Sequence, residues 1–146
     1  MNTIHISRIK QEDLLKLKVL YEELIEEPTD LTQLEGQFMI MDQDPHYFLL
    51  GAKDNDDLAG SVMGVICRDL IGDGRPFMVI ENVIVSKHHH RKGVGQLLMN
   101  ELERIANEHR CGYMILVSSG HRTAAHRFYE NLGYTEDVRG FRKMLK

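Results

Sequence analysis

The sequence has little cysteine and no long apolar run. Two cysteines among 146 residues are too few for the disulfide framework of a small secreted domain. No stretch approaches the roughly 18 consecutive apolar residues of a membrane-spanning helix, and the first ten residues, MNTIHISRIK, lack the apolar core of a signal peptide. We therefore expect a soluble, cytoplasmic protein without a membrane partner.

The chain has no excess of positive charge, with 18 Lys and Arg residues against 22 Asp and Glu residues. The net charge is −4 and the isoelectric point is about 6.0, which opposes a nucleic-acid-binding surface over the whole protein. A hydrophobic content of 42% and a charged content of 27% are typical of a globular chain, and a chain of this length buries a core without a disulfide or a structural metal. We expect a single domain over residues 1–146 that binds no nucleic acid.

The hydrophobic pattern predicts alternating strands and helices. Runs of alternating or continuous apolar residues predict strands over residues 3–9, 46–53, 58–70, 77–85, 113–117 and 138–145. Apolar residues at helical spacing predict helices over residues 12–27, 30–43, 94–109 and 122–132. A meander of strands thus precedes a crossover through a helix, which indicates an α/β protein.

The stretch SKHHHRKGVGQ, residues 86–96, contains three consecutive histidines and two glycines. Adjacent side chains point in different directions in both strands and helices, so three neighbouring histidines rarely converge on one metal ion. No carboxylate or cysteine with metal-ligand spacing lies beside them, and we expect no metal site. Arg91 and Lys92 form only a short basic pair in an acidic protein, which disfavours a nucleic-acid patch.

A third interpretation of this stretch rests on its position. A strongly predicted strand ends at Val85, and Gly93 and Gly95 open an amphipathic helix. A helix N-terminus offers unsatisfied backbone N–H groups to an anion, and glycine lets a ligand approach them closely. Arg91 and Lys92 add positive charge where a phosphate would lie. Taken alone, the same pattern is equally typical of a tight strand-to-helix turn.

Three segments together resemble one family. The strand VIENVIV (79–85), the turn HRKGVGQLL (90–98) and the helix AHRFYENLGY (125–134) resemble the GCN5-related N-acetyltransferase (GNAT) superfamily. The resemblance covers nearly the whole chain. It implies a mixed, mostly antiparallel sheet of six to seven strands, flanked by about four helices and splayed between the fourth and fifth strands. It also implies acetyl-CoA as co-substrate.

The resemblance further implies which residues contact the coenzyme. The family's loop has Arg or Gln, two residues, Gly, one residue, then Gly or Ala; here Gly93 and Gly95 match, whereas His90 stands at the first position. The main chain of the turn would bind the pyrophosphate, and the main chain at the end of the preceding strand would bind the pantetheine arm. Arg122 stands where the family often has Asn. The implied coenzyme contacts are Val83, Ile84, Val85, Arg91, Lys92, Gly93, Val94, Gly95, Gln96 and Arg122.

Two residues are candidates for catalysis. The resemblance implies that Tyr129 protonates the departing thiolate; the alternative is a core aromatic beside Phe128. An amine with a pKa of about 10.4 costs roughly 4–5 kcal/mol to deprotonate at pH 7, so a base is needed. Glu81 is the best candidate, because it is charged within an apolar strand and alternation predicts that it shares a face with Val83 and Val85. An exposed structural glutamate is the alternative, and His121 and His126 are other candidate bases.

The expected activity is acetyl transfer to a primary amine of a small molecule or peptide, by direct attack in a ternary complex. The segment between the first two predicted strands is acidic, which favours a cationic amine, although such a run is also typical of a solvated helix face. It carries the cluster Glu22, Glu23, Glu26, Glu27 and Asp30. An acyl-CoA-binding sensor or a transferase for longer acyl chains is the main alternative, and a metal- or nucleic-acid-binding regulator is another. The resemblance leaves a homodimer open.

Overall fold

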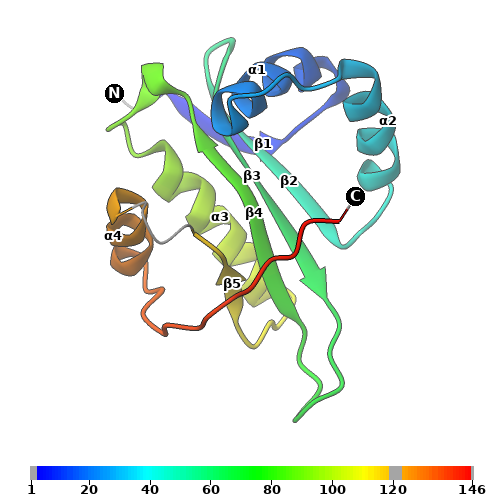
Figure 1. Ribbon diagram of the computed structural model, residues 1–146, viewed down its shortest axis with the longest axis vertical. Helices are drawn as coiled ribbons and strands as arrows, with labels where there is room; N and C mark the ends of the chain where they lie inside the picture. The colour runs from blue at the N-terminus through cyan, green and yellow to red at the C-terminus, as the bar shows by residue number, and fades with distance from the viewer. Residues whose placement is uncertain (1–2, 119–122, 146) are drawn as a thin grey trace. The chain divides into compact units, whose positions relative to one another are not determined.

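The computed structural model describes residues 3–118 and 123–145. It divides into two compact units, Met1–Ile115 and Leu116–Lys146. In chain order (Figure 1), the first unit contains β1 (Ile4–Arg8), α1 (Leu14–Ile25), α2 (Leu31–Asp42), β2 (Tyr47–Asp54), β3 (Asp57–Cys67), β4 (Phe77–Val85) and α3 (Val94–Glu108). The short strand β5 (Met114–Leu116) follows at the boundary, and α4 (Thr123–Asn131) belongs to the second unit.

The sheet is mixed, with the strand order β1-β2-β3-β4-β5. The first three pairings are antiparallel. The β5 strand joins β4 differently: Gly112 N–H donates to the Pro76 carbonyl (2.7 Å) and Met78 N–H donates to the Tyr113 carbonyl (3.0 Å), so residue numbers rise together as in a parallel pair. The α3 helix supplies the crossover that such a pair requires.

The described residues contain five strands, so the expected six to seven is too many. The strand predicted over 138–145 is wrong, because residues 135–145 have no regular secondary structure. Apolar residues alone do not make a strand, because only hydrogen bonds to a neighbouring strand make a segment part of a sheet. Exposed Phe141 and Leu145 illustrate that this segment lacks a buried face. The splay between β4 and β5 stays a prediction.

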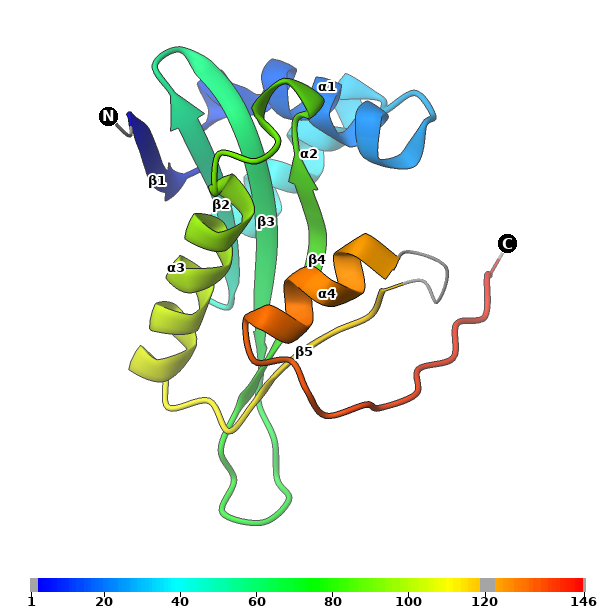
Figure 2. The same ribbon diagram turned by 90° about the vertical axis from the view of Figure 1, so that its left-hand side faces the viewer.

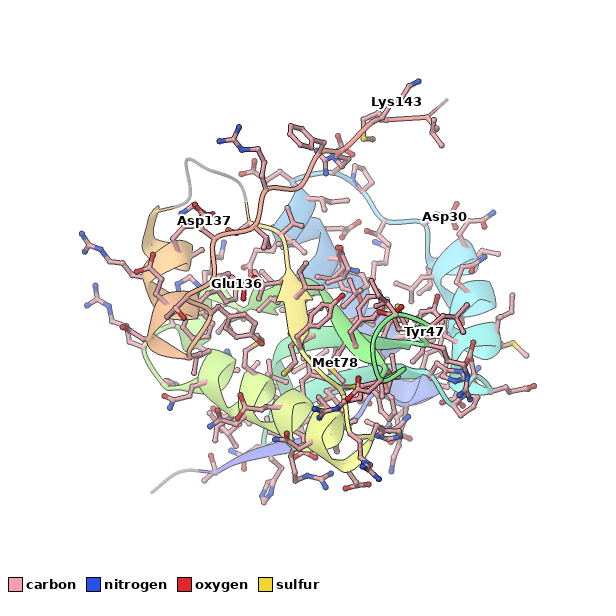
Figure 3. The ribbon with its side chains drawn as sticks, turned by 90° about the horizontal axis from the view of Figure 1, so that it is seen from below. Asp30, Tyr47, Met78, Glu136, Asp137 and Lys143 are labelled. Carbon is pink, nitrogen blue, oxygen red and sulfur yellow. The ribbon has the colours of Figure 1, made fainter. Side chains whose placement is uncertain are left out.

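Local chemistry explains where the first two helices begin and end. The Asp13 carboxylate accepts the Lys10 N–H (2.8 Å) at the entrance to α1. The α1 helix ends at Glu26, which has a left-handed φ of 57°. Asp30 lies at the start of α2 (Figure 3), and its carboxylate accepts the Gln33 N–H (3.1 Å), as expected of an N-cap. All four predicted helices are present. Where the chain is described, their bounds lie within two residues of the predicted ones.

The sheet is covered on both faces, with α3 on one side and α1 on the other (Figure 2). Leu14, Leu17 and Leu20 of α1 are buried against the sheet, as are Leu98 and Leu102 of α3. Fully burying such a side chain contributes about 1.5–3 kcal/mol. None of the helices in the described ranges has the length and apolar character needed to cross a lipid bilayer.

Candidate functional site

The end of β4 is irregular, and the irregularity lies beside the predicted coenzyme contacts. Ser61 of β3 pairs with Ile84, whereas Met63 pairs with Glu81, so two residues of β4 oppose the single residue Val62. This is a β-bulge. Asn82 within it has φ = 56°, in the left-handed region that asparagine adopts more readily than most residues.

The bulge overturns one sequence expectation. Alternation predicted that Glu81, Val83 and Val85 share a face, but this is wrong. The partners of Glu81 and Ile84 are two residues apart on β3, so Glu81 shares a face with Ile84, whereas Val85 lies opposite Gly60 and points to the other face. The Glu81 side chain is exposed. Its role as base is untested by this geometry and stays a prediction.

The backbone at the end of β4 has a defined orientation. Ser86 N–H donates to the Ala59 carbonyl of β3 (2.8 Å). Backbone groups of successive residues in a strand point to opposite edges, so the N–H and C=O of Val85 point away from β3. There the Val85 carbonyl lies 3.1 Å from His90 Nε2, which donates when it carries the ring proton.

The turn between β4 and α3 exposes backbone N–H groups. Arg91 (φ 65°) and Gly93 (φ 76°) are left-handed and flank Lys92, which is not. Such an alternation curves successive N–H groups towards one concave side, a known anion-binding arrangement. The left-handed conformation of Arg91 costs about 1–2 kcal/mol, so the surrounding contacts must stabilise it.

The first turn of α3 continues this arrangement. Gly93 is the N-cap and has no side chain to accept the first helical N–H groups, which therefore stay available at the positive end of the helix dipole. A Cβ atom placed on Gly93 would meet no atom of the described residues within 4 Å, so a ligand can approach the backbone. Arg91 and Lys92 are exposed beside it. The turn is suited to hold a phosphate group.

The three adjacent histidines have three different environments. His88 is exposed, His89 is buried, and His90 contacts the Val85 carbonyl. In the part of the chain that the structure describes, no group of three or more His, Cys, Asp or Glu side chains is placed to hold a metal ion. The burial of His89 was not foreseen, and no sequence signal separates it from its neighbours, because the turn alone decides which ring points inward.

Comparison with protein families identifies the family of this chain. The model of the acetyltransferase (GNAT) family matches residues 12–134. The chain belongs to the GNAT acetyltransferase family. Members of this family use acetyl-CoA. The coenzyme contacts expected at the turn between β4 and α3 stay predictions. Comparison with curated proteins found no match.

Solved structures share the GNAT fold of this chain. An acetyltransferase from Trypanosoma brucei is 24% identical, with a TM-score of 0.84 over 97% of this chain and 99% of that one. A transcriptional regulator from Bacillus halodurans C-125 is 20% identical, with a TM-score of 0.91 over 97% and 99%. AAC(6′)-Iy in complex with the bisubstrate analogue CoA-S-monomethyl-acetylneamine is 20% identical, with a TM-score of 0.82 over 99% and 100%. Identities this low show the fold alone.

The acidic run of this GNAT chain is largely engaged in local structure. Glu22 accepts hydrogen bonds from Thr29 N–H and from Lys18 Nζ, both at 2.9 Å, and these lower the pKa of its carboxyl group, the Thr29 bond most. Asp30 caps α2. The Glu23 carboxylate lies 3.3–3.4 Å from Lys87 N–H, which joins α1 to the turn after β4. Glu26 and Glu27 stay exposed, so the electrostatic case for a cationic acceptor rests mainly on them.

The second unit carries the predicted acid. Tyr129 lies on α4 and is half-buried, with its ring centroid 5.2 Å from that of Phe128 and 6.1 Å from that of Tyr134. The Tyr129 carbonyl accepts N–H bonds from Leu132 and Tyr134, which close the helix before left-handed Gly133. The role of Tyr129 at the sulfur stays a prediction. Arg122 and His121 lie outside the described residues.

Proposed function

We propose that this GNAT protein transfers the acetyl group of acetyl-CoA to a primary amine by direct attack in a ternary complex. The observation that carries the proposal is the turn before α3, where left-handed Arg91 and Gly93 present backbone N–H groups at an uncapped helix start. A doubly charged pyrophosphate satisfies these donors and gains from the helix dipole. A turn that served only to connect two elements would not need Arg91 and Lys92 beside it.

The coenzyme contacts fall into two groups in this proposal. The pyrophosphate binds the N–H groups of residues 91–96, with Arg91 and Lys92 neutralising its charge. The pantetheine arm lies along β4, where Val83 and Val85 contact it through their main chain and Ile84 lies between them. The Val85 N–H, which points away from β3, supports this assignment. Arg122 is proposed to contact the coenzyme or an acidic group of the acceptor.

The reaction requires a base for the ammonium, a hydrogen-bond donor for the oxyanion and an acid for the thiolate. Glu81, directly or through a water molecule, removes a proton from the ammonium of the acceptor. The neutral amine nitrogen attacks the thioester carbonyl, and a main-chain N–H near Val83 stabilises the oxyanion. The C–S bond then breaks and Tyr129 protonates the thiolate. The nitrogen loses its second proton to solvent, Tyr129 is reprotonated from solvent, and the amide and coenzyme A leave. No covalent intermediate forms on the enzyme.

The test is a panel of primary amines incubated with acetyl-CoA while thiol release is followed. Polyamines, aminoglycosides, amino sugars, amino acids and lysine peptides cover the acceptor classes, and a longer acyl-CoA replaces the donor in a parallel set. We expect at least one amine to accelerate thiol release saturably. Tyr129→Phe should then lower kcat while leaving coenzyme affinity unchanged. Coenzyme binding without acceleration by any amine would favour the acyl-CoA sensor instead.

A further inference from the structure

Asp54, at the end of β2, connects three segments that are distant in the sequence. Thr3 Oγ1 donates to its Oδ1 oxygen at 2.7 Å. Its Oδ2 oxygen lies 3.5 Å from His89 Nε2 and 3.9 Å from Lys92 Nζ. Both nitrogens belong to the turn between β4 and α3. The Asp54 carboxylate therefore faces two side chains of this turn. The backbone N–H groups of the same turn are proposed to bind pyrophosphate.

His89 is the buried member of this cluster. Its side chain is only 9% exposed, against 20% for Asp54 and 53% for Lys92. Its Nε2 atom faces the Asp54 carboxylate at 3.5 Å, the outer limit of hydrogen-bond distance. The buried Nδ1 atom has no partner among the described residues. The contact with Asp54 is thus the polar interaction that orients the ring.

We propose that His89 and Asp54 are positioning residues for the pyrophosphate of the coenzyme. They hold the turn between β4 and α3 against the end of β2, and Asp54 keeps the Lys92 ammonium beside this turn. This inference rests on the proposed function, since it concerns the same site. Neither residue touches the reacting atoms.

The conformation of the turn explains why it needs such an anchor. Arg91 and Gly93 are both left-handed, and neither belongs to a helix or strand whose hydrogen bonds would hold them. Glu23 holds the beginning of the turn at Lys87 N–H, and His90 contacts Val85. The His89 contact with Asp54 holds its middle. Without this contact, the turn becomes ordered only when the coenzyme binds. The free-energy cost of this ordering weakens the affinity for the coenzyme.

The test compares two acetyl donors, acetyl-CoA and acetyl-pantetheine, which lacks the pyrophosphate. His89→Asn removes the nitrogen that faces Asp54, whereas His89→Gln places an amide N–H near the Nε2 position. Asp54→Ala removes the carboxylate. His88→Asn is the matched control, because His88 is exposed and adjacent. Thermal unfolding is measured for every variant, and the dissociation constant of coenzyme A is measured by calorimetry.

We expect His89→Asn and Asp54→Ala each to weaken coenzyme A binding and to raise the KM for acetyl-CoA about tenfold, the size of one lost charge-assisted contact, with kcat nearly unchanged. Activity with acetyl-pantetheine should change less than about twofold. His89→Gln should recover most of the affinity, and the double variant should be no weaker than either single one. His88→Asn should behave as the wild type.

An equal loss with both donors would show a general structural role and overturn the proposal, as would an unchanged affinity for coenzyme A in His89→Asn. Additive effects of His89→Asn and Asp54→Ala would show that the two residues do not act as a pair. If the wild-type protein binds no coenzyme A, the proposed function itself fails. The wild-type measurement therefore separates the failure of the function from the failure of this inference.

Discussion

Single residues in this protein depend on contacts that their neighbours in sequence do not reveal. His88, His89 and His90 are chemically identical, yet only His89 is buried. The alternation of β4 is interrupted at Asn82, which has a φ of 56° and lies in the bulge that adds one residue to the strand. Sequence patterns indicated the importance of this region, but the orientation of Glu81 relative to Val85 depends on the bulge between them.

The burial of Tyr21 makes the stability of the protein depend on pH in the alkaline range. Burial raises the pKa of its hydroxyl group from 10.0 to about 12. The folded protein therefore holds this proton more tightly than the unfolded chain does, so the associated stability is complete below pH 10 and is lost as the pH rises towards 12. At pH 11, about one unit above the ordinary value, the loss amounts to about 1.4 kcal/mol.

Tyr21→Phe removes this titration while keeping the aromatic ring. Urea unfolding at pH 9 and pH 11 should show a smaller decrease in the free energy of unfolding for the variant than for the wild type, by about 1.4 kcal/mol. Tyr47→Phe is a suitable control for tyrosine replacement in general. Equal decreases in wild type and Tyr21→Phe would contradict the burial argument.

At the scale of elements, sequence patterns located most helices and strands, and the expected meander is present in the pairing of β2 with β3 and of β3 with β4. The predicted bounds of β4 are those observed, and α3 begins at the predicted Val94. Both elements have strong local sequence patterns. The β4 strand is an apolar run rich in β-branched residues, and α3 has apolar residues at helical spacing after a glycine. The segment 138–145 was also expected to be a strand, but its apolar residues Val138, Phe141 and Met144 are spaced by three and it forms no strand. Pairing depends on distant segments, which a local pattern does not contain.

The packing of α3 against the sheet depends on Gly60. A Cβ atom there would lie 2.8 Å from the Ile84 carbonyl oxygen and 3.0 Å from Val94 Cγ1, at the junction of β4 and α3. Gly60→Ala should therefore move backbone atoms, lower the free energy of unfolding by about 1–3 kcal/mol and weaken coenzyme A binding.

Gly64→Ala is the matched control for this substitution. Its Cβ atom would meet the Leu102 and Met78 side-chain ends at 2.8 and 3.0 Å, and such ends can move. Its effect on coenzyme affinity should be small. Chemical unfolding and calorimetry of both variants check the prediction, and an equal loss of coenzyme affinity in the two would contradict it.

At the scale of the whole molecule, the family could be inferred from sequence whereas the acceptor could not. The resemblance rested on three segments, and the family model that matches residues 12–134 confirms it. The chemistry of the coenzyme is fixed, so its contacts follow a sequence pattern. The acceptor is recognised by side chains, and no fixed sequence pattern specifies them. Three of the five acidic residues expected to attract a cationic acceptor make structural contacts instead. The single domain, the location and a homodimer stay predictions.

The central claim is that the main-chain turn before α3 binds the pyrophosphate of coenzyme A. Calorimetric titration of the wild-type protein with coenzyme A and with pantetheine, which lacks the pyrophosphate, tests it most directly. We predict one saturable site, with coenzyme A bound at least about tenfold more tightly than pantetheine because only coenzyme A reaches the N–H groups and cations of the turn. Equal affinity for the two ligands, or no binding of coenzyme A at millimolar concentration, would contradict the claim.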